Sequence, residues 1–287
     1  MEKLIFGDNQ FFGVNHYSEE KSEQQLKRFD SVEKIVDVLR IAYETGLKGF
    51  MLHSHPLAQQ ICDVIRSDQQ YWKDLVIYPA IPHPVKYMNK VGEMGIYRTV
   101  LDLLKEGKNM SSTLGSFFKG GLGLMTKNPI TLGKAAIELE MQPYHGLNVG
   151  AVFLHNIAVD LLLGFGINSP YPQIEEFINN KYNAELGYIT LNMPLLVDSL
   201  SRVGITKPLI MSSFNRIGYY MNPDQKTCEK YVLEDKVRLV AMSVLASGAI
   251  APKDAADYLR KFPLASVIFG ASSQQNIRNT YDLFSSF

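Results

Sequence analysis

The stretch Gly49-Phe50-Met51-Leu52-His53-Ser54-His55-Pro56 shows the pattern that recurs along the chain: a short apolar run, then polar residues and a proline. Such a run is typical of a strand buried on both faces. Residues 30–46 come before it. They open as a capping box, Asp30-Ser31-Val32-Glu33, and continue with apolar residues at helical spacing. We expect the first helix of the chain to begin there and a second helix to span about residues 57–65.

Seven more apolar runs, each followed by helical sequence, repeat this unit. They cover residues 4–6, 75–81, 149–154, 186–191, 208–211, 237–242 and 265–269. Strands that alternate with helices predict an α/β fold, and eight such units favour a (β/α)₈ TIM barrel. A doubly wound sheet should carry a glycine-rich turn after its first strand, and Gly7-Asp8-Asn9-Gln10-Phe11 is not one. We therefore expect residues 1–287 to form a single barrel domain, because 287 residues is a usual size for that fold.

A long helical insertion is expected between the third and fourth strands. The segment 82–148 holds a predicted helix at 97–105, a Gly/Ser-rich stretch at 111–123 and a second predicted helix at 130–140. One interpretation is an ordinary inserted helix pair. The other is a lid over the mouth of the barrel, because long loops after barrel strands are where such lids occur.

Composition indicates a globular protein without an electrostatic partner. Hydrophobic residues make up 46% of the chain, and 29 basic residues balance 29 acidic ones. Nothing here indicates nucleic acid or a membrane as a partner, and a small-molecule substrate is expected. Met1-Glu2-Lys3 does not resemble a signal peptide, and Cys62 and Cys228 lack metal-site spacing. These features predict a cytoplasmic protein with buried thiols. The oligomeric state stays open.

Histidines gather at the expected mouth. Five of the six follow strand ends, namely His16, His53, His55, His83 and His155. Because side chains alternate along a strand, His53 and His55 are expected to point the same way. They could bind one divalent metal, Zn²⁺, Fe²⁺ or Mn²⁺, with His83, His16 or His155 and the Asp8 carboxylate completing the site. In the alternative interpretations these histidines bind substrate or transfer protons without a metal, or are structural.

An anion site is predicted where the eighth strand meets the last helix. Gly270-Ala271-Ser272-Ser273-Gln274-Gln275 places small residues and hydroxyls at a helix N-terminus, where backbone N–H groups and the helix dipole favour a negative charge. Ser247 and Gly248, after the seventh strand, would assist. The ligand would be a phosphate group on a substrate or a cofactor. Simple capping of the helix by Ser272 or Ser273 is the alternative.

Several segments, in this order, resemble the aldo-keto reductase family. They are Ala42-Tyr43-Glu44-Thr45-Gly46-Leu47-Lys48-Gly49-Phe50, Phe153-Leu154-His155-Asn156, residues 187–194 with 207–215, Ser243-Val244-Leu245-Ala246-Ser247-Gly248, and residues 266–280. The resemblance implies an NADP-dependent barrel enzyme. It implies that His155 is the catalytic histidine, that Asn192 binds the carboxamide of the cofactor, and that residues 266–280 bind the cofactor phosphate.

The chain departs from the family at three of the four catalytic positions. The family uses Asp, Tyr, Lys and His, but here Met51 aligns with the aspartate, His55 or Pro56 with the tyrosine, and Ala80 or Ile81 with the lysine. Met211 also stands where a cofactor-binding glutamine is expected. Our leading hypothesis is acid/base or metal-assisted chemistry by a lyase, isomerase or hydrolase on a polar substrate, with or without a phosphate. The alternatives are an NADP-dependent oxidoreductase with an altered tetrad and an inactive ligand-binding barrel.

Overall fold

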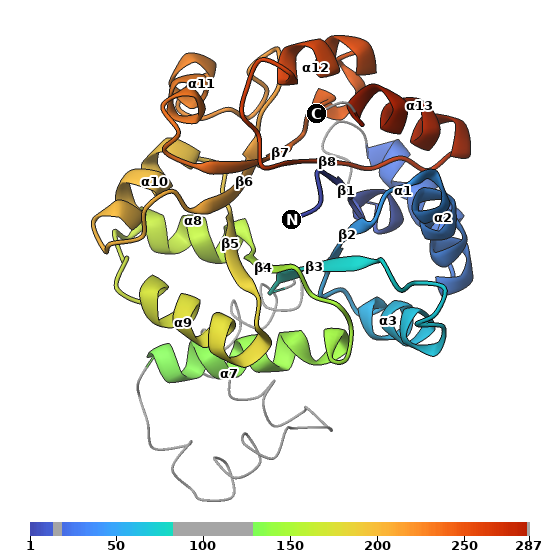
Figure 1. Cartoon of the computed structure of the whole chain (residues 1–287), viewed down its shortest axis with the longest axis horizontal. Coiled ribbons are helices and arrows are strands. Elements are labelled where there is room, and N and C mark those ends of the chain that lie inside the picture. Colours follow the sequence, from blue (N-terminus) through green and yellow to red (C-terminus); the bar gives the residue numbers. More distant parts are fainter. Residues whose placement is uncertain (14–18, 83–128, 286–287) are drawn as a thin grey trace, which may run out of the picture.

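The computed structural model describes residues 1–13, 19–82 and 129–285, and its strands close into a barrel (Figure 1). Neighbouring strands are parallel throughout, and β8 pairs with β1 to close the ring. The strands are β1 (Leu4–Phe6), β2 (Gly49–His53), β3 (Val76–Ile81), β4 (Ala151–Leu154), β5 (Glu185–Ile189), β6 (Leu209–Ser213), β7 (Arg238–Met242) and β8 (Ser266–Phe269). The predicted barrel is confirmed, and the expected strand limits agree with the observed ones to within two residues.

Helices surround the strands on the outside of the barrel (Figure 1). The α-helices are α1 (Glu19–Arg28), α2 (Val32–Thr45), α3 (Ala58–Ser67), α7 (Pro129–Met141), α8 (Asn156–Gly164), α9 (Tyr171–Tyr182), α10 (Met193–Ser201), α11 (Gln225–Leu233), α12 (Pro252–Leu259) and α13 (Gln274–Phe284). Short 3₁₀ turns lie at η1 (Asn9–Phe11), η2 (Gln142–Tyr144) and η3 (Ala246–Gly248). The helix expected at 130–140 is α7. The helix expected at 97–105, the stretch 111–123 and the rest of residues 83–128, which make up most of the possible lid, lie outside the described residues.

The expected start of the first helix is wrong. The turn η1 and the helix α1 come before it, and α1 has the sequence EEKSEQQLKR, in which Leu26 is the one apolar residue. A helix without apolar periodicity gives no signal to a search that depends on it. The capping box at Asp30–Glu33 is also not formed. Helix α2 begins at Val32, and the hydroxyl of its N-cap residue, Ser31, makes no capping bond.

The core has two layers because strand side chains alternate between the inside of the barrel and the surrounding helices. The inner layer is the cluster Ile5, Met51, Tyr78, Ala80, Ala151, Phe153, Ile189, Leu209, Met211 and Val240. A larger cluster fills the space between strands and helices. Inside the barrel, the Phe153 ring lies against Gly187, where a Cβ atom would stand 2.4 Å from the ring. The interior is therefore filled by side chains, and substrate chemistry is left to the mouth.

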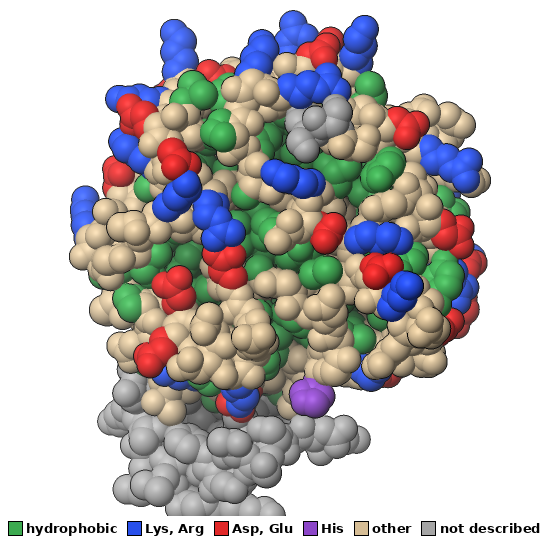
Figure 2. Space-filling view, viewed as in Figure 1, with side chains coloured by type: hydrophobic (Ala, Val, Ile, Leu, Met, Phe, Trp, Pro, Cys, Tyr) green, Lys and Arg blue, Asp and Glu red, His purple; other side chains and the backbone are tan. Residues whose placement is uncertain are grey.

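The surface agrees with the balanced composition. Basic and acidic side chains are interspersed over the face shown in Figure 2. No helix among the described residues is long and apolar enough to cross a membrane. Both cysteines are buried, as expected, and burial raises the pKa of Cys62 to about 12 and that of Cys228 to about 11. At neutral pH both are thiols, which are poor nucleophiles.

Gly187→Ala tests the packing of the interior. The added methyl group must displace the Phe153 ring, and we expect a loss of about 1–3 kcal/mol in the free energy of unfolding, measured by denaturant titration. Gly164→Ala, at the end of α8, is the matched control, because no atom lies within 4 Å of the added Cβ. Equal stability of the two variants would contradict the packed interior.

Candidate active site

Two histidines extend the inner face of the barrel at its mouth. Met51 and Phe153 belong to the inner cluster. Two residues further along β2 and β4 come His53 and His155, on the same side of the alternating pattern. Their rings meet edge to face, with centroids 5.5 Å apart. Residues from strands that are not sequence neighbours are thus brought together where barrel enzymes place their chemistry.

The buried carboxylate of Asp8 holds His53 at two points. Asp8 follows β1 and is 1% exposed. Its Oδ2 accepts the backbone N–H of His53 at 2.7 Å, and its Oδ1 lies 2.8 Å from the ring nitrogen Nδ1. A carboxylate on Nδ1 fixes the orientation and tautomer of an imidazole and leaves Nε2 as the nitrogen that exchanges protons. Asp8 and His53 therefore form an acid–base pair.

Asp8 also controls the protonation of this pair. Burial by itself lowers the pKa of His53, but the charge of Asp8 and its hydrogen bond raise it, and the net effect is a pKa above the ordinary value. A buried imidazolium is stabilised here because its counter-charge is in direct contact with it. His53 is thus suited to act as a proton donor near neutral pH.

His155 takes a different role through its own hydrogen bond. It is the N-cap of α8, and its Nδ1 accepts the backbone N–H of Ile157 at 3.3 Å. Since Nδ1 is an acceptor, Nε2 carries the proton and can act as a donor. A proton-exchanging imidazole beside a donor imidazole can polarise a carbonyl oxygen and protonate it, or move a proton between adjacent carbons.

His55 does not join this pair in the expected way. Strand β2 ends at His53, and the chain turns there, because the backbone N–H of His55 donates to the carbonyl of His53 at 2.7 Å. The His55 ring stacks on Phe12 at 3.9 Å, and its Nδ1 accepts the N–H of Leu57. The expectation that both imidazoles leave one extended strand in the same direction is therefore wrong.

The metal-site prediction is not supported by these contacts. No three His, Cys, Asp or Glu side chains within residues 1–13, 19–82 and 129–285 come together as a candidate metal site. His16 and His83 lie outside the described residues, so the full proposed ligand set stays a prediction. The residues aligned with the family's aspartate and lysine, Met51 and Ala80, pack in the barrel interior, as does Met211 at the position of the cofactor-binding glutamine.

A cavity of about 420 Å³ lies at the same end of the barrel, beside the N-terminus of α13. Its lining includes Gly248, Gly270 and Ser272, which the sequence assigned to a phosphate, together with Gln10, Gln25, Leu245, Ile250, Ala251, Pro252, Ala271, Asn276, Asn279 and Thr280. The Arg28 guanidinium donates to the side chain and to the carbonyl of Ser272. A cation and a helix N-terminus are therefore close to one wall of this cavity.

Three other residues predicted for cofactor binding do not line this cavity. Ser273 caps α13 by accepting the N–H of Asn276 at 3.3 Å, as the capping alternative expected. Asn192 caps α10 in the same way through the N–H of Leu195. Ser247 comes directly before Gly248 in the turn η3. Their proposed roles with a cofactor stay predictions.

Two side chains that line this cavity, Gln10 and Gln25, each have a buried amide oxygen without a hydrogen-bond donor among the described residues. Gln10 is 6% exposed, and its Nε2 donates to the carbonyl of Gly7 at 2.6 Å, but its Oε1 has no partner. This oxygen lies close to Gly270, where a Cβ atom would approach it to 2.1 Å. The Oε1 of Gln25 is also unpartnered. Buried acceptors without donors are rare and suit a ligand that brings N–H or O–H groups.

Sequence reasoning missed Glu140 and Tyr144, which bind the C-terminal end of β2. Ser54 donates to the carboxylate of Glu140, and the Tyr144 hydroxyl donates to the carbonyl of Leu52 at 2.9 Å. Glu140 lies in a helix that the sequence predicts, but nothing in the neighbouring sequence distinguishes it from Glu138, two residues earlier in the same helix. Its partner is 86 residues away, and no local signal indicates that its side chain is buried.

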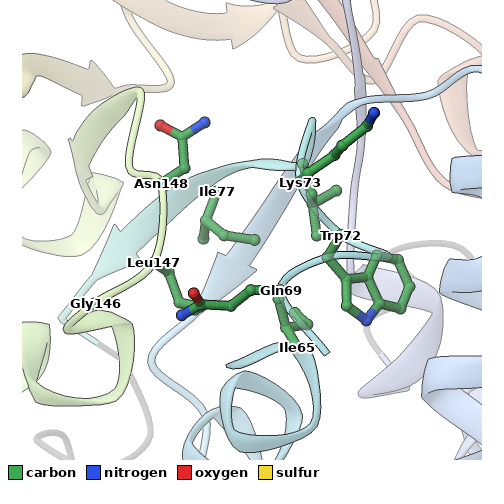
Figure 3. Close-up of a pocket in the computed structure, with 9 residues that line it drawn as sticks. Ile65, Gln69, Trp72, Lys73, Ile77, Gly146, Leu147 and Asn148 are labelled. Atoms are coloured by element: carbon green, nitrogen blue, oxygen red, sulfur yellow. The ribbon is translucent and has the colours of Figure 1, made fainter. Parts of the chain in front are cut away.

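A second cavity, of about 320 Å³, lies at the opposite end of the barrel. Figure 3 shows its lining, which comes from the end of α3, the approach to β3 and the loop before β4. The lining residues are Ile65, Gln69, Trp72, Lys73, Leu75, Ile77, Gly146, Leu147 and Asn148. None of them is a carboxylate, imidazole or thiol, so this cavity lacks the acid–base groups of the mouth.

Asp8→Asn tests the acid–base pair. The amide has no charge to stabilise an imidazolium, while burial still disfavours the charged ring, and we expect the His53 pKa to fall. NMR titration of the imidazole carbon-bound protons measures it. Asp30→Asn, which removes an exposed carboxylate paired with Lys34, is the control and should leave His53 unchanged. An unaltered His53 pKa in the Asp8 variant would show that the carboxylate does not govern its protonation.

Solved structures with a similar barrel include proteins described as aldo-keto reductases. One from Pseudomonas aeruginosa is 11% identical, covers 99% of this chain and 90% of that chain, and has a TM-score of 0.63. An aldo-keto reductase of the silkworm Bombyx mori is 13% identical, with 99% and 79% covered and a TM-score of 0.56. A protein described as a 2,5-diketo-D-gluconic acid reductase B is 11% identical, with 98% and 82% covered and a TM-score of 0.57.

No family model and no curated protein sequence matches the chain. At identities of 11–13%, the structural similarity establishes the fold and leaves the chemistry to the residues of the site. The resemblance first drawn from the sequence is confirmed at that level: the chain has the barrel fold of the aldo-keto reductases, without the aspartate and lysine of their catalytic tetrad at the aligned positions.

Proposed function

We propose that this barrel is a nicotinamide-dependent oxidoreductase that reduces the carbonyl group of a small polar molecule. The observation that carries the proposal is the Asp8–His53 pair beside His155 at the mouth. It supplies the proton donor that carbonyl reduction needs, at a site where the tyrosine of the aldo-keto reductases is replaced. The fold favours this reaction over the lyase, isomerase or hydrolase that the sequence first suggested.

The cavity beside α13 fits the nucleotide that such a reaction requires. Its unpartnered Gln10 and Gln25 oxygens would accept hydrogen bonds from amino or hydroxyl groups of a nucleoside. Ser272, Arg28 and the N-terminus of α13 would hold a phosphate. A nicotinamide cofactor held by these residues would supply the hydride, which no side chain of the protein can provide.

The remaining chemistry belongs to the histidines. Nε2 of His155 would donate a hydrogen bond to the substrate oxygen and draw negative charge onto it. Nε2 of His53 would give that oxygen a proton, and Asp8 would stabilise the imidazolium before the transfer. Ser213, at the end of β6, lies on the same side of the strand as the inner-layer residues Leu209 and Met211, and its small side chain would leave room for a substrate above the apolar interior.

Acid–base catalysis without hydride transfer is the second candidate. The same two imidazoles could move a proton between carbons, as in an isomerase or lyase, and the apolar Met51 and Ala80 at the tetrad positions favour a changed reaction. The two functions differ in the cofactor. Failure of the chain to bind reduced nicotinamide nucleotides, together with turnover of an isomerisable substrate, would select the second. A barrel that binds ligands without turnover is the remaining outcome.

Ser272→Glu tests the nucleotide site. A carboxylate at this position repels a phosphate and captures the Arg28 guanidinium, so we expect the affinity for NADPH to fall at least tenfold, measured by quenching of its fluorescence. Ser285→Glu, at the other end of α13, adds the same charge to an exposed serine and is the matched control. Equal affinities in both variants would place the nucleotide elsewhere.

His53→Gln tests the proton donor. Because the imidazolium is the donor, reduction should be fastest at low pH and fall as the pH rises through the raised pKa of His53. The variant should lose about 10²–10⁴-fold in kcat and should also lose this pH dependence. His145→Gln changes an exposed histidine away from the mouth and serves as the control. Reduction that keeps both its rate and its pH profile in the His53 variant would rule out the assignment.

A further inference from the structure

The C-terminal end of β2 is held by side chains on both sides. From the β1 side, Asp8 accepts the backbone N–H of His53. From the other side, the Tyr144 hydroxyl donates to the carbonyl of Leu52, and the Ser54 hydroxyl donates to the Glu140 carboxylate. Three consecutive residues, Leu52 to Ser54, are therefore each bound by a side chain from another part of the chain.

The two residues on the second side come from one short segment. Glu140 lies in the last turn of α7, and Tyr144 ends the adjoining turn η2. Both are buried, with exposures of 2% and 1%. Burial, together with the nearby carboxylates of Asp8 and Glu140, holds the pKa of Tyr144 well above its ordinary value, so its hydroxyl stays a donor. The carboxylates of Asp8 and Glu140 thus bind neighbouring residues of the same buried segment, His53 and Ser54, from different sides.

A buried carboxylate at Glu140 is costly unless it serves a specific contact. Removing such a group from water costs several kcal/mol, which hydrogen bonds must offset. Where a surface helix packs against a barrel, apolar side chains such as the buried Met141 next to Glu140 are sufficient. The contact with Ser54 reaches the mouth. It joins α7 to the residue between His53 and His55.

We propose that Glu140 and Ser54, with Tyr144, are positioning residues that fix the turn after β2 and so keep the His53 imidazole aligned with Asp8 and the substrate. The inference rests on the proposed acid–base role of His53 and extends it to residues that do not touch the substrate. Without these contacts the backbone after β2 becomes more mobile, and the His53 imidazole loses its alignment with Asp8 and the substrate. A misplacement of about 1 Å in a catalytic group can cost about 10²-fold in rate.

The experiment compares Ser54→Ala, Glu140→Ala and Tyr144→Phe with Glu140→Gln in the full chain. An amide at 140 still accepts the Ser54 hydroxyl, so it should restore most of the activity lost in Glu140→Ala. We expect Ser54→Ala and Glu140→Ala to lower kcat about tenfold or more, with KM and NADPH affinity within twofold of wild type. The imidazole of His53, followed by NMR, should shift its pKa toward the ordinary value in both.

Ser199→Ala is the matched control for loss of stability. Ser199 is another buried serine, and its hydroxyl donates to the Asn168 side chain at 2.6 Å on the far side of the barrel. It should lose stability as Ser54→Ala does, without a change in kcat or in the titration of His53. If Ser54→Ala also leaves both quantities unchanged, the contact is merely structural and the proposal is overturned.

The titration separates this inference from the proposed function. If no carbonyl substrate is reduced but the His53 pKa moves in Ser54→Ala and Glu140→Ala, the positioning role stands and the reaction is a different one. If reduction is observed and neither kcat nor the His53 pKa depends on Ser54, the function stands and the positioning role fails. Should Glu140→Ala fail to fold, Ser54→Ala and Tyr144→Phe decide the outcome.

Discussion

The contact between the Asp8 carboxylate and His53 is the interaction on which the rest of the site depends. A carboxylate that is 1% exposed would be strongly disfavoured without partners. Both of its oxygens are satisfied by one residue, through the backbone N–H and the ring of His53. The pairing of Ile5 with Gly49 and of Phe6 with Phe50 sets this contact, because it places Asp8, two residues after β1, beside the last residues of β2. Strand register and the geometry of the candidate site are therefore fixed together.

In the proposed function, the mouth has a proton-transfer side and a ligand-binding side. His53 and His155 lie over the apolar interior, and the cavity beside α13 is lined by two glutamines whose buried amide oxygens have no donor among the described residues, with a cation close to a helix N-terminus. Aldo-keto reductases share the barrel, but the residues at the catalytic end differ in this chain. A barrel tolerates such exchange because its stability lies in the strands and helices and its chemistry in the loops that follow the strands.

The strands could be predicted from the sequence because each is a short apolar run with a polar end. Helix α1 could not, since its sequence is almost entirely polar. At the site, Asp8, His53 and His155 were identified as candidates, but the role of Asp8 was not, because its contact with His53 depends on strand register across 45 residues. His55 was expected to continue the extended strand beyond His53, but the chain turns there. Glu140 and Tyr144 were missed, because burial of a polar side chain is a tertiary property.

The most direct measurement of the central claim is a crystal structure of the chain grown with NADP⁺. The account predicts the adenosine end in the cavity between Gln10 and α13, with the nicotinamide ring at the mouth beside His53 and His155. It also predicts the Asp8–His53 contact in the bound state. A structure with the nucleotide bound elsewhere, or with a metal ion held by His53 and His155 in place of the nicotinamide, would contradict it.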